Sequence, residues 1–158
     1  MFIQWLSEKE PGQLFSIDEF KEAFPHLNLR KVIRQALDEK MLLRWAPRVY
    51  GIPRQMSNLF LGYAGYAPPG VARISACYAK SKKWIYTRHP AYWINLLGVS
   101  TQVPVRDVYV KVGRSHQLCI YRNSERGGSF MVDFNEEPIT HALALAHRPI
   151  GPVLVSLY

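Results

Sequence analysis

The chain has 158 residues, with 48% apolar and 13% aromatic side chains, two cysteines and a formal net charge of +8 at pH 7. This length and apolar content predict a folded globular protein of one domain or two small ones, and two cysteines exclude a disulfide-rich scaffold. The positive charge favours a polyanionic or acidic partner, and no apolar run approaches the roughly 20 residues that span a bilayer, so no membrane partner is predicted.

The first residues predict a short packed helix and no signal peptide. Met1 to Leu6 is apolar, lacks a basic start and a cleavage site, and is soon followed by Glu8. We therefore expect a cytoplasmic protein, in which Cys77 and Cys119 are buried thiols in a reducing compartment.

A second helix is predicted to begin after Ser16. Glu19 follows three residues later, the spacing of a capping box, and Pro25 ends the helix. Only residues 25–27 separate this helix from the next predicted one. So short a connection forces two helices to cross steeply, as in a helix-turn-helix.

The stretch from Asn28 to Pro53 predicts a helix followed by a hairpin. Asn28 suits the N-cap of a helix that runs to about Lys40, and apolar residues recur at helical spacing on one stripe. The opposite stripe is polar and mostly basic. Residues 42–45 and 49–52 then predict two strands around a turn, with Pro53 as the stop. This order is that of a winged helix-turn-helix.

The charges of this stretch support binding to double-stranded DNA. From Asn28 to Arg54 there are seven Lys+Arg against two Asp+Glu. Arginine and lysine neutralise phosphates, and a helix of this kind fits the major groove, where arginine and glutamine read base edges. The alternative is that the charges only solvate a surface helix. The residues predicted to enter the groove are Arg30, Lys31, Arg34 and Gln35, and those predicted to contact phosphate or the minor groove are Arg44 and Arg48.

Residues 55–70 are rich in glycine, tyrosine and proline, and they predict a linker. It would join a winged-helix domain, residues 1–54, to a small mixed α/β interaction domain, residues 71–158, so the predicted fold class is α+β. Helices are expected at 70–80, 91–97, where Gly98 is the C-terminal cap, and 138–147. Strands are expected at 84–86, 106–112, 118–121 and 130–134, the middle two forming a hairpin.

The segment Asn95–Pro104 reads Asn-Leu-Leu-Gly-Val-Ser-Thr-Gln-Val-Pro. It resembles the signature of the AbiEi-like antitoxin family of type IV toxin-antitoxin systems, in which a similar run lies just before a strand. The resemblance extends over residues 10–122. Supporting positions include Phe15, Phe20, Val32, Leu37, Arg44, Tyr50, Pro53, Arg73, Ala76, Ala79, Trp84, Tyr86, Pro90, Val108 and Tyr109.

The resemblance implies a bacterial, plasmid-derived or phage-derived antitoxin. Its winged helix would repress its own operon through operator DNA, and its second half would neutralise a nucleotidyltransferase-like toxin. The family usually has a glycine just ahead of the tyrosine in the wing, where Arg48 or Val49 stands here, so the turn of the wing is expected to differ.

Two alternatives remain open. The winged fold could serve a protein–protein interaction module without specific DNA binding, in which the basic second half grips an acidic toxin or another partner. The signature itself suits a joint as well as a contact with a partner, because Gly98 can end a helix and Pro104 can start a strand.

Catalytic and metal-binding patterns are missing. The five histidines lie at no metal-ligand interval from cysteines or carboxylates, and no glycine-rich phosphate loop follows a strand. Asp133 with Glu136 or Glu137 is the nearest approach to a metal-binding pair. We therefore expect no metal, no cofactor and no enzyme activity.

Overall fold

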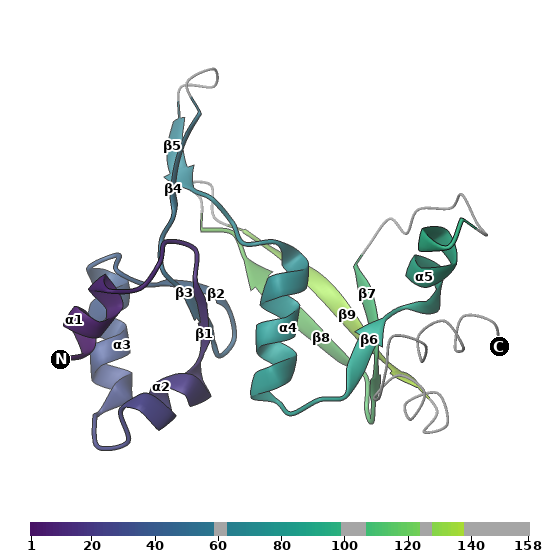
Figure 1. Ribbon diagram of the computed structural model, residues 1–158, viewed down its shortest axis with the longest axis horizontal. Helices are drawn as coiled ribbons and strands as arrows, with labels where there is room; N and C mark the ends of the chain where they lie inside the picture. Colours follow the sequence, from purple (N-terminus) through teal and green to yellow (C-terminus); the bar gives the residue numbers. More distant parts are fainter. Residues whose placement is uncertain (59–62, 99–106, 124–127, 138–158) are drawn as a thin grey trace. The chain divides into compact units, whose positions relative to one another are not determined.

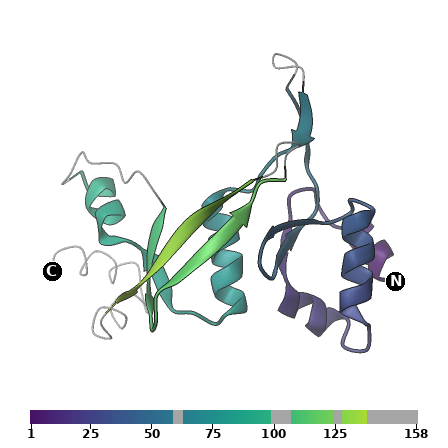
Figure 2. The same ribbon diagram turned by 180° about the vertical axis from the view of Figure 1, so that it is seen from behind.

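The computed structural model describes residues 1–58, 63–98, 107–123 and 128–137, and its helices and sheets confirm the predicted α+β class (Figures 1 and 2). The chain divides into two compact units. Unit 1 comprises residues 1–81 and 119–130, and unit 2 comprises residues 82–118 and 131–158.

Unit 1 begins with a strand enclosed between short helices. The elements are α1 (Phe2–Ser7), β1 (Leu14–Ser16), α2 (Ile17–Ala23), α3 (Leu29–Asp38), β2 (Leu43–Ala46) and β3 (Val49–Gly51). The three strands form an antiparallel sheet in the order β1-β3-β2. The predicted capping box is confirmed, because the Ser16 hydroxyl accepts from the Glu19 amide at 3.3 Å and the Glu19 carboxylate from the Ser16 amide at 2.6 Å.

Both faces of this sheet are covered. On one face lies the core of α1, α2 and α3, where fully buried Phe20 packs edge-on against Phe2 with ring centroids 5.5 Å apart. The helix α4 (Val71–Ser81) packs on β1, β2 and β3 and buries Ile74 and Tyr78. Figures 1 and 2 show α4 at the face of the sheet away from α1–α3.

This packing changes the division predicted from the sequence. The predicted boundary at residues 55–70 separated α4 from the first domain, whereas α4 belongs to unit 1 because it covers the second face of the sheet. The predicted linker itself contains an antiparallel hairpin of β4 (Gln55–Asn58) and β5 (Tyr63–Tyr66). Its glycines and prolines indicated a break in structure, but the strands between them still pair.

The second sheet is mixed. Its strands are β6 (Tyr86–Arg88), β7 (Val108–Val112), β8 (His116–Tyr121) and β9 (Ser129–Glu137), in the order β6-β7-β9-β8, and α5 (Pro90–Leu96) follows β6. The predicted hairpin of β7 with β8 is wrong, because β9 lies between them and runs parallel to β7. This pairing stacks Tyr109 on Phe134 at 5.0 Å, a contact that the alternation within each strand does not specify.

Unit 2 also holds a buried cation. The ammonium of Lys111 lies 4.4 Å from the centroid of the Trp84 ring and donates to the Val112 carbonyl at 3.1 Å. Burial lowers the pKa of Lys111, and the opposite charge of Glu136, its partner across the β7–β9 pairing, acts against this shift.

The end of α5 agrees with its predicted cap. Gly98 has φ +72°, and its amide donates to the Asn95 carbonyl at 2.9 Å. The predicted helix at 138–147 and the signature residues after Gly98 lie outside the described residues.

Candidate nucleic-acid interface

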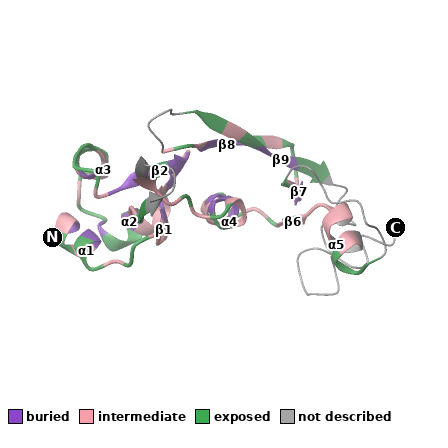
Figure 3. Ribbon diagram, turned by 90° about the horizontal axis from the view of Figure 1, so that it is seen from above, coloured by how far each residue is buried: buried purple, intermediate pink, exposed green. Residues whose placement is uncertain are grey.

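Helix α3 presents the predicted contact residues. Its predicted N-cap is confirmed, because the Asn28 side chain accepts from the Lys31 amide at 3.3 Å. The side facing the core carries Ile33 and Ala36, which are 5% and 0% exposed. Figure 3 colours the helix by burial and shows that much of α3 is exposed. Burial of that stripe fixes the rotation of the helix and so turns its polar stripe outward.

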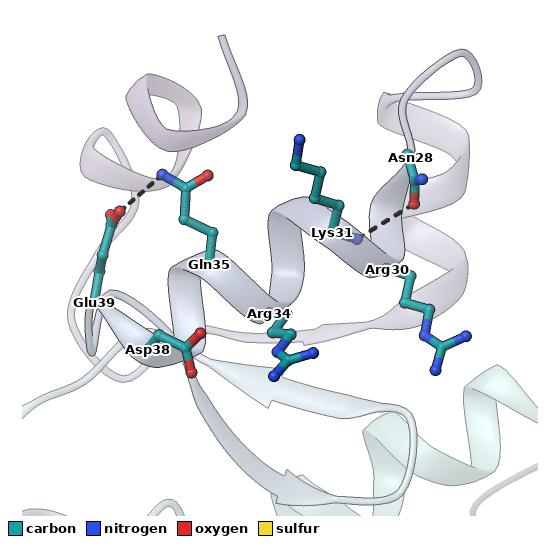
Figure 4. A pocket seen from close by; sticks show the side chains of 7 residues that line it. All are labelled: Asn28, Arg30, Lys31, Arg34, Gln35, Asp38 and Glu39. Atoms are coloured by element: carbon teal, nitrogen blue, oxygen red, sulfur yellow. Dashed lines mark hydrogen bonds between the residues drawn. The ribbon is translucent and has the colours of Figure 1, made fainter.

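Seven side chains surround an open hollow of about 460 Å³ on this outer stripe (Figure 4). They are Asn28, Arg30, Lys31, Arg34, Gln35, Asp38 and Glu39. Residues four apart in sequence extend to the same side: Arg30, Arg34 and Asp38 form one row, and Lys31, Gln35 and Glu39 form the other. The cations thus occupy the first part of the helix, and the carboxylates occupy its end.

This order of charge is unfavourable for the helix itself. The first turn holds no acidic residue and the last turn no basic one. A cation near the positive N-terminal end, or an anion near the C-terminal end, costs about 0.3–1 kcal/mol. Repulsion between Arg30 and Arg34, four residues apart, destabilises the helix by about a further 0.2–0.5 kcal/mol. Helix stability therefore does not explain why these charges lie where they do.

The four groove residues differ in how free they are. Arg30, Lys31 and Arg34 are exposed and form no ion pair with another described residue. The Gln35 side-chain amide donates one N–H to the Glu39 carboxylate at 2.8 Å, which leaves its second N–H and its carbonyl oxygen for other partners.

Arg44 is exposed at the edge of the sheet. Strand β2 is an edge strand, and Arg44 is paired with Tyr50, which packs with the core of α1–α3. Side chains of directly paired residues lie on the same face of a sheet, so Arg44 and α3 share a face. The guanidinium of Arg44 lies 5.4 Å from the centroid of the Tyr121 ring.

Arg48 is held inside unit 1, apart from the other predicted contacts. Its Nη2 donates to both carboxylate oxygens of Asp18, at 2.7 and 2.9 Å, and its carbonyl accepts from the Ile17 amide at 2.9 Å. The hydrogen bond from Arg48, with its charge, lowers the pKa of Asp18, against a smaller opposing effect of burial. Arg48 thus ties the β2–β3 turn to the start of α2, and Asp18 holds Nη2 of its guanidinium and neutralises its charge.

Sequence reasoning missed two residues of this surface, Tyr121 and Asn123. Tyr121 lies beside Arg44, and the Asn123 side chain donates to the Arg44 carbonyl at 3.0 Å. Both lie far along the chain in the part predicted as a second domain. No local sequence pattern predicts this contact, because Tyr121 and Asn123 meet Arg44 only through the tertiary fold.

Other chemistry is sparse in the part of the chain that the structure describes. No group of three metal-binding side chains occurs there, and no helix there is long and apolar enough to cross a membrane. Cys77 and Cys119 are free thiols, each half-buried. Burial, with the nearby negative charge of Glu19, raises the pKa of Cys77 to about 11, so this thiol is protonated at neutral pH.

Comparison with known proteins gives one family match. The family described as "Family of unknown function (DUF6088)" matches residues 2–125. No curated protein and no solved structure matches the chain.

Proposed function

The chain belongs to the DUF6088 family of unknown function, and we propose that it is a DNA-binding transcriptional regulator whose N-terminal part acts as a winged helix-turn-helix. The order α1, β1, α2, α3, β2, β3 supports this proposal, since two helices joined by a short connection precede a hairpin of two strands. In such a unit α3 is the helix that enters the major groove.

The observation that carries the proposal is the outer stripe of α3. Three cations, Arg30, Lys31 and Arg34, are exposed together without an ion-pair partner among the described residues. Their positions oppose the helix dipole, so a partner that is itself negative accounts for them better than helix stability does. Duplex DNA supplies that charge at a spacing and groove width that suit one helix.

Each residue has a definite role in this proposal. Arg30 and Arg34, in one row, face guanine edges or phosphates, and Lys31 faces a phosphate from the other row. Gln35 reads adenine with its carbonyl oxygen and the N–H that Glu39 does not accept. Arg44 contacts phosphate from the sheet, whereas Arg48 is not among the contacts because its ion pair with Asp18 neutralises its charge.

The resemblance to AbiEi-like antitoxins extends the proposal to the operator of the protein's own operon and to a toxin as partner. On that basis the regulator represses its own operon and neutralises a nucleotidyltransferase-like toxin. This part of the proposal rests on the resemblance alone.

The test is a titration of labelled duplex DNA from upstream of the gene at two salt concentrations. Arg34→Ala is expected to weaken binding by about 1–3 kcal/mol if Arg34 reads a base. If Arg34 touches only phosphate, the negative slope of log K against log salt should become shallower by about 1.

The matched control removes an arginine from the other face of the sheet. Arg73 is exposed on α4, which packs on the strands away from α3, so Arg73→Ala should bind as the wild type does. Equal losses in both variants would mean that binding depends on total charge. If Arg34→Ala binds like the wild type at both salts, α3 is not the contact.

A further inference from the structure

A segment from late in the chain contacts the sheet of unit 1. The Asn123 side-chain amide donates to the main-chain carbonyl of Arg44 at 3.0 Å, and the Tyr121 ring lies 5.4 Å from the Arg44 guanidinium. All three residues belong to unit 1, although the contact joins positions 79 apart in sequence.

The two contacts act on different parts of Arg44. Strand β2 lies at the edge of its sheet, where main-chain groups on the outer side lack a strand partner, and Asn123 satisfies one of these carbonyls. The aromatic ring restricts the long side chain of the same residue. Asn123 therefore fixes the backbone of Arg44, and Tyr121 fixes its guanidinium.

The partner of Arg44 differs in kind from the partner of Arg48. A carboxylate accepts from Nη2 of Arg48 through both of its oxygens and neutralises the charge of the guanidinium. An aromatic ring attracts a guanidinium through its face and leaves its in-plane N–H groups and its charge available. Arg44 is thus both held in place and able to bind an anion.

We infer that Tyr121 and Asn123 are positioning residues that hold Arg44 to contact a DNA phosphate beside the groove occupied by α3. This inference rests on the proposed function and extends its surface beyond residues 1–54. Ordering a free arginine side chain costs about 2 kcal/mol of conformational entropy. A side chain that is already held in place loses less of this entropy on binding. The ligand at this position is the phosphodiester backbone, because a guanidinium matches the geometry of two phosphate oxygens.

The experiment measures DNA affinity and its salt dependence for a set of full-length variants. Arg44→Gln should lower the salt slope by about 1. Tyr121→Leu should weaken binding by about two- to five-fold, the value of one exposed cation–π contact, and Tyr121→Phe should retain wild-type affinity because it keeps the ring.

The double variant Arg44→Gln/Tyr121→Leu separates a positioning role from a structural one. If Tyr121 acts through Arg44, the double variant should bind as Arg44→Gln does. Additive losses would overturn the inference, because Tyr121 would then act on the fold or on another contact. Thermal unfolding of each variant identifies losses that come from instability.

The outcomes also distinguish this inference from the proposed function. Arg44→Gln changes an exposed residue, so wild-type affinity and salt slope in this variant would overturn the inference even if Tyr121→Leu fails to fold. If Arg34→Ala still weakens binding in that case, the proposed function stands without it. A wild-type protein that binds no duplex DNA rejects both.

Discussion

Arg48 adopts a backbone conformation that residues with side chains seldom take. Its φ is +65°, in the turn between β2 and β3, and its guanidinium binds both oxygens of Asp18. The side chains of this ion pair are each 36% exposed, so solvent screens the pair and only a modest contribution to stability is expected from its charges. Its main effect is geometric, since it joins the turn to the start of α2.

Replacement of Arg48 should change stability and leave DNA contacts unchanged. Both variants lose the ion pair, but glycine adopts the positive φ without strain, whereas the β-carbon of alanine is strained there. Arg48→Gly should therefore be more stable than Arg48→Ala by about 1 kcal/mol. Urea unfolding measures this difference. Neither variant should lower the salt slope of DNA binding, and a slope reduced as in Arg34→Ala would show that Arg48 does reach a phosphate.

At the scale of an element, α3 combines two demands that oppose each other. Its N-cap and buried stripe favour the helix, while its charges disfavour it. A conflict between local stability and residue choice is expected at functional sites, where binding requires a residue that folding does not. This element therefore offers a test in which stability and binding move in opposite directions.

Lys31→Glu makes that test. Lys31 is the third residue of α3 and follows Asn28 at the capping-box interval, so a glutamate there should favour the dipole and the cap and raise stability by about 0.5–1 kcal/mol. The same variant should weaken DNA binding, because it replaces a phosphate contact with a negative charge. Urea unfolding and DNA titration of one preparation check both effects. Loss of stability together with binding would contradict this account of α3.

At the scale of the whole molecule, the two units are not consecutive pieces of the chain. Unit 1 takes in α4 and residues 119–130 as well as the N-terminal elements. Its sheet is buried on the side of Trp45 and Val49, which are 2% and 0% exposed, and α4 packs on those strands. A fragment that ends at the predicted boundary would leave this face in water.

A comparison of fragments tests this dependence. Residues 1–54 should fail to unfold cooperatively, whereas residues 1–81, which keep α4, should unfold with a transition. Ile74 and Tyr78 each contribute about 1.5–3 kcal/mol on burial, a large part of the roughly 5–15 kcal/mol that stabilises a domain. Urea unfolding followed by circular dichroism measures the transitions, and equal stability of the two fragments would mean that α4 is dispensable.

The sequence by itself determined the features that depend on near neighbours. The caps at Ser16 and Asn28, the amphipathic stripe of α3 and the glycine after α5 were all predicted and confirmed. Each follows from hydrogen bonds or periodicity within about four residues, so the local run of side chains contains the information.

Only the tertiary structure decided which distant residues meet. It paired β7 with β9. It also joined Arg48 to Asp18, which are 30 positions apart in sequence, and Asn123 to Arg44, which are 79 positions apart. Several strands and several cations could have filled these places with equal local propensity. The choice was made by burial and packing of the assembled core, which no short window of sequence contains.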